Sequence, residues 1–241
     1  MLWDSQTALY YDQWIESPQG SFALEQQKKL LLSLIAPWPR RRQKLLDLGC
    51  GTGMFLDFFW SCGFDLTGLD SSPSMLARAR TKIGSRADLH LGQGEHLPFD
   101  DKEFDYCALM TVLEFVHDPI QVLTEVLRVT RKGILFLFLN RTSLYRLGLL
   151  RSHKDSVLSQ AHWFSWWEIR TLMNQRIQPS AFRAQSILLG PTSTWRAVPI
   201  MGYVNSLLLP PWLGAVTAVA VDLVPMVAQT PLIAWETEPT G

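Results

Sequence analysis

Cysteine is scarce in this chain of 241 residues, and neither sign of charge is in excess. The three cysteines, Cys50, Cys62 and Cys107, form no C-x-x-C pair and are odd in number, so we expect no disulfide framework and a reducing, cytoplasmic compartment. Lys and Arg number 22, as do Asp and Glu, so the chain lacks the basic excess of nucleic-acid-binding proteins. The first residues contain no basic segment followed by an apolar run, and we expect no signal peptide.

Several catalytic motifs are also absent. No histidines, cysteines and carboxylates follow metal-ligand spacing, which predicts no metal site. The H-E-x-x-H, G-x-S-x-G and G-x-x-x-x-G-K-[ST] motifs do not occur. Cys50 stands where a glycine-rich stretch needs a small residue, and we predict no covalent intermediate.

One long segment, residues 198–221, has no charge at all. Its length is sufficient to cross a bilayer. However, Pro199, Pro210 and Pro211 would remove helix hydrogen bonds that lipid cannot replace. We therefore favour a core or lid segment, and the alternative is an interfacial or substrate-facing segment that contacts a membrane peripherally.

Hydrophobic residues make up 47% of the chain and charged residues 18%, which is typical of a globular protein. Strands and helices alternate along residues 44–140, which predicts a doubly wound, Rossmann-like α/β fold with a mostly parallel sheet and helices on both faces. Strands are expected at 44–48, 64–70, within 87–95, within 104–115 and at 134–139, and helices at 20–36, 54–62, 72–83 and 119–129.

The pattern becomes weaker after Asn140. We predict a helix at 165–174 and an antiparallel last hairpin of strands 185–189 and 231–236, separated by an irregular apolar insertion at 191–225. The chain is interpreted as a single domain, 1–241. Its parts are an N-terminal helical cap (1–43), a ligand-binding core (44–140) and a substrate-side segment (141–241).

The stretch "LLDLGCGTGMF" places Gly49, Gly51 and Gly53 directly after the first strand. Ligands of doubly wound sheets bind at the carboxyl ends of the strands, where glycines allow a tight turn and close approach of the backbone. The dinucleotide fingerprint G-x-G-x-x-G is not matched, because Met54 replaces its third glycine. Asp70 ends the second strand and can accept hydrogen bonds from both hydroxyls of a ribose. The pattern indicates a nucleoside site without provision for a pyrophosphate.

Four stretches, "LLDLGCGTG", "GLDSSPSMLARAR", "GQGEHLPFDDKEFDYC" and "VLEFVHDPIQVLTEVLRVTRKGILFLF", occur in this order over residues 44–140. They resemble the class I S-adenosylmethionine-dependent methyltransferases, in particular the type 11-like family. The resemblance implies S-adenosylmethionine as cofactor. It assigns the glycine loop to the methionine and the ribose edge, Asp70 to the ribose, and Asp47 to ordering the loop or reaching the methionine amine through water. The full predicted cofactor set is Asp47, Gly49, Cys50, Gly51, Gly53, Asp70, Ser71, Met75, Gly94, Glu95, Thr111 and Leu113.

Within that set, the resemblance places Gly94 and Glu95 along the adenine, and Thr111 or Leu113 under the methionine. Ser71 departs from the family, which usually has an apolar residue there. Asp47 as a loop brace and Glu95 as a solvated carboxylate remain alternatives.

Two residues are candidates for catalysis. His117 follows the fourth strand and is our candidate base, with a helix-cap or surface role as the alternative. Tyr11 is expected near the transferred methyl group.

Aromatic residues are frequent in the segments expected to form the substrate walls, and they suit a small apolar or aromatic acceptor. They are Tyr10, Trp14, Trp163, Phe164, Trp166, Trp167, Trp195 and Trp212. The run "HWFSWW" is more typical of one packed helix face than of a substrate cage.

The leading hypothesis is O- or C-methylation of a small molecule. The alternatives are a lipid- or quinone-directed C-methyltransferase at a membrane face and a non-catalytic binding protein that retains the fold. An NAD-dependent oxidoreductase is disfavoured by the glycine spacing.

Overall fold

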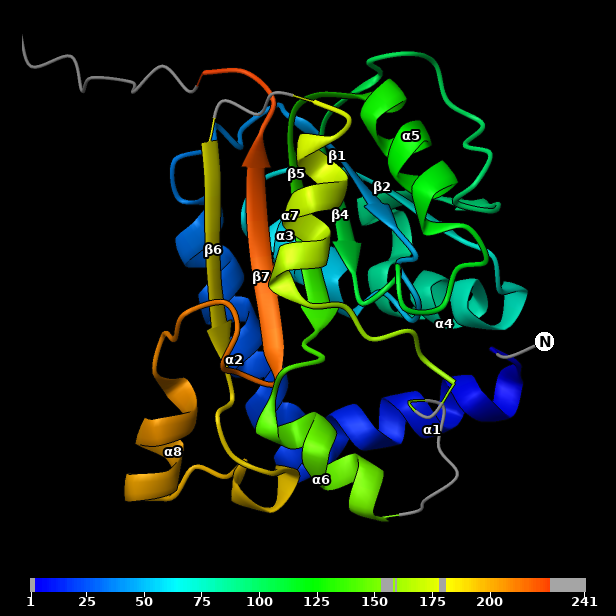
Figure 1. Ribbon diagram of the computed structural model, residues 1–241. Helices are drawn as coiled ribbons and strands as arrows, with labels where there is room; N and C mark the ends of the chain where they lie inside the picture. The colour runs from blue at the N-terminus through cyan, green and yellow to red at the C-terminus, as the bar shows by residue number, and fades with distance from the viewer. Residues whose placement is uncertain (1–2, 153–157, 159, 178–180, 226–241) are drawn as a thin grey trace, which may run out of the picture.

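The computed structural model describes residues 3–152, 158, 160–177 and 181–225. Within them, seven strands form one sheet in the order β3-β2-β1-β4-β5-β7-β6 (Figure 1). The first five strands pair in parallel, and β7 runs antiparallel to both β5 and β6. The predicted fold class is confirmed. The strands are β1 Lys44–Leu48, β2 Asp65–Asp70, β3 Ala87–Leu91, β4 Phe104–Met110, β5 Thr130–Leu139, β6 Ala181–Ile187 and β7 Val216–Asp222.

Several helices begin with a capping side chain followed by proline. Ser17, Ser72 and Asp118 each accept a hydrogen bond from a backbone N–H of the first turn of α2, α4 and α5, and each precedes a proline whose fixed φ suits the first helical position. The helices are α1 Ser5–Glu16, α2 Pro18–Ile35, α3 Met54–Ser61, α4 Pro73–Ile83, α5 Pro119–Val129, α6 Leu144–Ser152, α7 Trp166–Asn174 and α8 Pro199–Ser206. Short 3-10 turns are η1 Gly84–Arg86 and η3 Thr192–Thr194.

Apolar side chains cover both faces of the sheet. Successive strand residues point to opposite faces, so Leu45 packs in one cluster with Leu31 of α2, and Leu46 packs in another with Val122 of α5 and Met173 of α7. Figure 1 shows α5 and α7 in front of the sheet and α2 behind it. The parallel strands β1, β2, β4 and β5 are mostly buried on both faces, whereas the edge strand β3 is largely exposed, so the carboxyl ends of the inner strands are the accessible place for a site.

The last hairpin differs from the prediction. The strand expected at 185–189 lies at Ala181–Ile187, and its partner is β7, Val216–Asp222, inside the segment that we predicted to be irregular. The other predicted partner, 231–236, lies outside the described residues. The run "VTAVAVD" is buried along its whole length because β7 lies between two strands and under helices on both faces, so it lacks the alternation that marks a half-buried strand.

The uncharged segment 198–221 therefore has two parts. Residues 216–221 belong to strand β7 and are buried, which agrees with the core interpretation for this part of the segment. Residues 198–213 contain α8 and a following loop with many exposed apolar side chains. Among the described residues, no helix is both long enough and apolar enough to span a bilayer.

Candidate functional site

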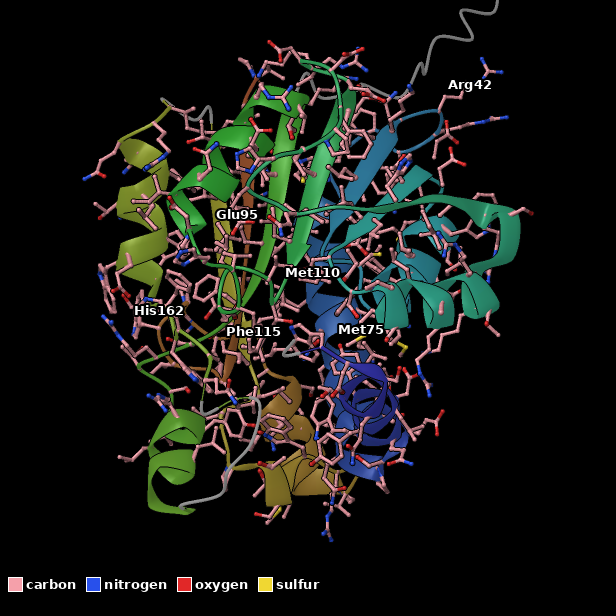
Figure 2. All side chains as sticks on the ribbon, turned by 90° about the vertical axis from the view of Figure 1, so that its right-hand side faces the viewer. Arg42, Met75, Glu95, Met110, Phe115 and His162 are labelled. Atoms are coloured by element: carbon pink, nitrogen blue, oxygen red, sulfur yellow. The ribbon has the colours of Figure 1, made fainter. Side chains whose placement is uncertain are left out.

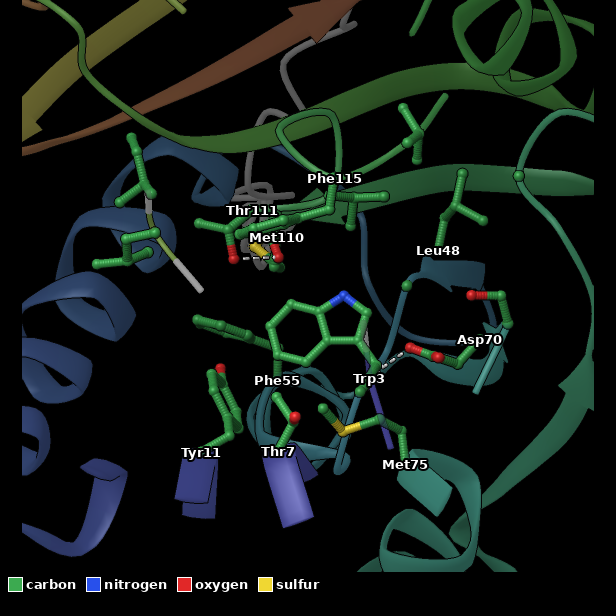
Figure 3. A pocket seen from close by; sticks show the side chains of 18 of the residues that line it. Trp3, Thr7, Tyr11, Leu48, Phe55, Asp70, Met75, Met110, Thr111 and Phe115 are labelled. Carbon is green, nitrogen blue, oxygen red and sulfur yellow. Dashed lines mark hydrogen bonds between the residues drawn. The ribbon is translucent and has the colours of Figure 1, made fainter. Parts of the chain in front are cut away.

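A cavity of about 1180 Å³ opens at the carboxyl ends of the parallel strands. Figure 2 shows Met75, Met110 and Phe115, all of which line it, gathered at this end of the sheet, with Arg42 at the opposite end. The close-up in Figure 3 shows the Trp3 indole across the cavity between Asp70 and the side chains of α1. The site thus lies where ligands bind in doubly wound sheets.

The three glycines of the loop after β1 serve different purposes. All have positive φ, at 68°, 53° and 84° for Gly49, Gly51 and Gly53. A Cβ on Gly49 would lie 2.5 Å from Val112, and one on Gly53 would lie 3.1 Å from Ile83 of α4, so both allow close packing. A Cβ on Gly51 would meet nothing within 4 Å, because this glycine borders the open cavity.

Asp70 links the loop to the end of β2. One of its carboxylate oxygens accepts a hydrogen bond from the Gly51 N–H at 2.8 Å, and the other accepts from the Ser72 N–H at 2.8 Å. Burial raises the pKa of Asp70, and the hydrogen bonds from Ser72 and Gly51 partly offset that rise. The carboxylate lines the cavity, so its remaining acceptor capacity faces a ligand.

Asp47 is the exceptional group of the site. Both of its oxygens are buried without a hydrogen-bond partner, whereas buried carboxylates are ordinarily paired. Burial, with the nearby charge of Asp70, raises its pKa well above the usual range. Burial and the same two carboxylates also raise the pKa of the neighbouring Cys50 thiol, which keeps it protonated and unsuited to nucleophilic attack. Neither residue contributes to the cavity wall itself.

The N-terminal helix α1 forms one wall of the cavity; it lies within the predicted helical cap 1–43, although within that cap bounds were predicted only for the helix at 20–36. Its Asp12 carboxylate is buried and accepts hydrogen bonds from Thr52 of the glycine loop at 2.7 Å and from Arg78 and Lys82 of α4 at 2.6 Å each. Burial alone would favour the neutral acid, but these hydrogen bonds lower the pKa of Asp12. The same helix carries Tyr11 into the cavity, so Asp12 attaches this wall directly to the loop.

Tyr11 is a proton donor rather than a base in this environment. Burial, followed by the negative charges of Asp12 and Asp47, raises its pKa to about 12. The phenol therefore stays protonated at neutral pH. Figure 3 shows its hydroxyl directed into the cavity beside Phe55.

The loop after β4 contains Thr111 and Leu113, and only the first of them faces the cavity. Thr111 lines the cavity with φ of 55°, an outlier for a β-branched residue, and strain of this kind clusters at functional sites. Leu113 instead is buried in the core with residues of α5 and does not line the cavity, so of the two residues expected under the methionine only Thr111 borders the cavity.

Glu95 and His117 meet through the backbone. A Glu95 carboxylate oxygen accepts hydrogen bonds from the His117 N–H at 3.1 Å and the Asp118 N–H at 3.4 Å. Glu95 thus orders the loop before α5, in addition to lining the cavity with Gly94, and is not simply solvated. His117 is exposed at the cavity rim.

Glu114 does not line the cavity. One of its oxygens accepts from the Leu139 N–H at 2.7 Å, and burial raises its pKa to about 7.

The far side of the cavity is apolar and aromatic. Tyr145 of α6 and Trp195 pack at 5.0 Å between ring centroids, and both line this part with Trp14 of α1. Trp163, Phe164 and Trp166 of "HWFSWW" are instead buried in the core, as predicted, but the run is not one helix face, because α7 begins only at Trp166 and Trp167 is exposed. Ser71 and Met75 border the Asp70 side. The described residues contain no cluster of metal-ligating side chains.

Sequence reasoning missed several cavity residues, including Trp3, Thr7, Phe55, Phe115 and Tyr145. One usable signal existed for α1, because Asp4 caps it by accepting the Thr7 N–H at 2.8 Å. The others are brought together only by the tertiary fold.

Comparison with known proteins gives consistent findings. Residues 46–138 match the family described as "Methyltransferase domain". Malonyl-[acyl-carrier protein] O-methyltransferase of Erwinia billingiae is 39% identical over 111 residues, 45% of this chain and 43% of that protein. Demethylmenaquinone methyltransferase of Renibacterium salmoninarum is 36% identical over 95 residues, 38% of each chain. The chain thus matches less than half of the length of these relatives.

A similar solved structure extends the likeness to the whole fold. A SAM-dependent methyltransferase of Thermotoga maritima superposes with a TM-score of 0.72 over 91% of this chain and 97% of that one, at 20% identity. At this identity the likeness concerns the fold alone.

Proposed function

The chain carries a methyltransferase domain of the class I S-adenosylmethionine-dependent family, and from that premise we propose that it transfers a methyl group from S-adenosylmethionine to a small apolar or aromatic acceptor. The observation that carries the proposal is the pair of carboxylates beside the glycine loop. Asp47 has two buried oxygens without partners, and Asp70 presents an acceptor to the cavity.

These residues suit the parts of the cofactor. The Asp70 carboxylate, already aligned by the Gly51 N–H, would accept hydrogen bonds from ribose hydroxyls. The open space above Gly51 admits a ligand against the backbone. The unpaired Asp47 carboxylate lies behind the cavity wall and would balance the ammonium group of the methionine moiety through water. Gly94 and Glu95 would border the adenine, and Thr111 the methionine.

S-adenosylmethionine, when bound, supplies an activated methyl group on a sulfonium. The protein's part is to hold the acceptor in line with that group and to exclude water. Positioning of this kind can supply roughly 7–11 kcal/mol of the barrier. Trp14, Tyr145 and Trp195 would enclose the acceptor, and their rings suit an apolar or aromatic molecule.

If the methyl group is transferred to a hydroxyl, a base must remove the proton of that hydroxyl. His117 at the cavity rim is the candidate base, because the Tyr11 phenol is itself protonated and cannot take up a proton. Replacing His117 with Asn should then lower kcat by about 10²–10⁴-fold while leaving cofactor affinity unchanged. An unchanged kcat would show that the acceptor loses its proton without this histidine.

The activity is tested with isotopically methyl-labelled S-adenosylmethionine and a set of lipophilic phenols, quinols and acyl thioesters. Labelled product detected by mass spectrometry from the native protein, and lost in Asp70→Ala, supports the proposal. Cofactor binding without transfer to any acceptor favours the non-catalytic alternative.

The second candidate is methylation of a lipid or quinone at a membrane face. The exposed apolar side chains of α8 favour it, since they lie beyond the aromatic side of the cavity.

A further inference from the structure

Helix α8, Pro199–Ser206, is inverted with respect to an ordinary surface helix. Its one buried residue is polar, Asn205, at 1% exposure. Its apolar side chains face outward instead, with Ile200 at 81% and Tyr203 at 67% exposure. Surface helices normally bury an apolar stripe against the core. The outward face of α8 therefore has no partner within the described part of the chain.

Asn205 holds the helix to the molecule through hydrogen bonds. Its side-chain oxygen accepts from the Gly190 N–H at 3.0 Å, and its amide donates to the Thr194 carbonyl at 3.0 Å and to the Met201 carbonyl at 2.9 Å. The Leu188 N–H donates to the backbone carbonyl of Asn205 at 3.2 Å. This polar attachment fixes α8 in place and leaves its apolar side free.

The apolar exposure continues beyond the helix. Leu208, Trp212 and Leu213 follow along the chain and are exposed. Trp212 stacks on the exposed Trp167 of α7, with ring centroids 6.0 Å apart. Tyrosine and tryptophan are the residues that favour a membrane–water interface, since each combines an apolar ring with a polar group.

The charge of this region is of one sign, although the whole chain is neutral. No Asp or Glu occurs from 169 to 221, whereas arginines occur at 170, 176, 183 and 196. Arg183 is compensated by its ion pair with Asp222. The exposed Arg196 stands three residues before α8 begins. An exposed apolar helix face with the exposed Arg196 next to it in the chain complements an anionic lipid surface.

We propose that the outward face of α8 and the loop 207–213 dock onto an anionic bilayer surface. Figure 1 shows α8 below the sheet, at the same end as α1 and α6, the helices that border the cavity. The cavity residue Trp195 precedes α8 by four positions, so docking brings the aromatic side of the cavity close to the lipid. A lipid-borne acceptor could then enter directly, a consequence that rests on the proposed function, whereas the docking itself does not.

Flotation with lipid vesicles in the absence of cofactor tests the docking. The native protein should bind phosphatidylcholine vesicles that contain phosphatidylglycerol more strongly than vesicles of phosphatidylcholine alone. Ile200→Glu should weaken binding about tenfold or more, because an apolar side chain no longer enters the interface. Arg196→Gln should weaken binding to the anionic vesicles about fivefold and leave binding to neutral ones unchanged.

Leu32→Glu is the matched control, since Leu32 is an exposed leucine of α2 and the change adds the same charge. Absence of binding by the native protein, or equal losses in Ile200→Glu and Leu32→Glu, overturns the proposal. So does a native dimer that Ile200→Glu converts to monomer in light scattering, because the face would then join two copies. Titration of Ile200→Glu with S-adenosylhomocysteine should match the native protein, so failure of docking and failure of the proposed function are read separately.

Discussion

Replacing Asp47 with Asn should stabilise the protein without ligand and weaken its binding of cofactor. The native carboxylate is buried and makes no hydrogen bond, so its charge is uncompensated. An amide of the same shape removes that charge. The amide is still a buried polar group without partners, so the gain is only the additional cost of the charge, on the order of 1–3 kcal/mol in the free energy of unfolding. The melting temperature of a chain of this size should then rise by about 2–4 °C for each kcal/mol.

The stabilising effect of Asp47→Asn should depend on pH. Because the pKa of Asp47 is raised in the folded protein, the folded state holds the proton more tightly than the unfolded chain does. The native protein therefore loses stability as pH rises from the usual carboxyl range through the raised pKa. Asp47→Asn should abolish the loss of stability that comes from this carboxyl group. The melting temperatures of the native protein and of the variant should therefore converge at low pH and separate at neutral pH.

Cofactor affinity should change in the opposite direction. Losing a charge-assisted interaction costs about 1.5–3 kcal/mol, which corresponds to a roughly 10–150-fold higher Kd for S-adenosylhomocysteine. The assays are thermal unfolding across pH and calorimetric titration. Asp65→Asn, which changes an exposed carboxylate at the start of β2, should alter neither quantity. A lower melting temperature with unchanged affinity in Asp47→Asn would refute the reasoning and identify Asp47 as a loop brace.

Three further changes test other parts of the account. Gly51→Val should raise the Kd for S-adenosylhomocysteine at least about tenfold, because the valine side chain would project into the open cavity from a backbone with positive φ. The far-ultraviolet circular dichroism spectrum should stay native. An unchanged Kd would contradict the placement of the ligand. Asp12→Asn should lower the free energy of unfolding by about 1–3 kcal/mol at neutral pH and speed hydrogen exchange in α1, since it loses the 2.6 Å ion pair with Lys82. Because the pKa of Asp12 is lowered in the folded protein, this loss of stability should shrink as pH falls. A loss that does not depend on pH would count against the ion pair. Asp222→Ala should lower the free energy of unfolding, measured in urea, by about 3–5 kcal/mol, because the buried Trp38 indole N–H and the Arg183 guanidinium lose their acceptor. A loss below about 1 kcal/mol would show that these groups find other partners.

The regular half of the fold was predictable because its signals are local. Helix α5 occupies Pro119–Val129 as predicted, since Asp118 and Pro119 mark its start and its apolar residues recur with helical spacing. The glycine loop and Asp70 were predictable for the same reason, because tight turns and strand ends leave marks in a few adjacent residues.

The other half depends on contacts that no short window of sequence contains. Strand β7 was missed because a strand buried on both faces resembles any apolar run, and only its position between β5 and β6 distinguishes it. Leu113 and Thr111 are two residues apart, yet the positive φ of Thr111 sends the chain in a direction that buries Leu113 in the core. Trp195 and Tyr145 are far apart in the sequence, and only the tertiary fold brings their rings into contact.

The central claim is that the cavity beside the glycine loop binds S-adenosylmethionine. The most direct test is isothermal titration of the purified protein with S-adenosylmethionine and S-adenosylhomocysteine, with NAD as the control ligand. The account predicts stoichiometric binding of the first two and none of NAD. Binding of NAD, or of none of the three, would contradict it.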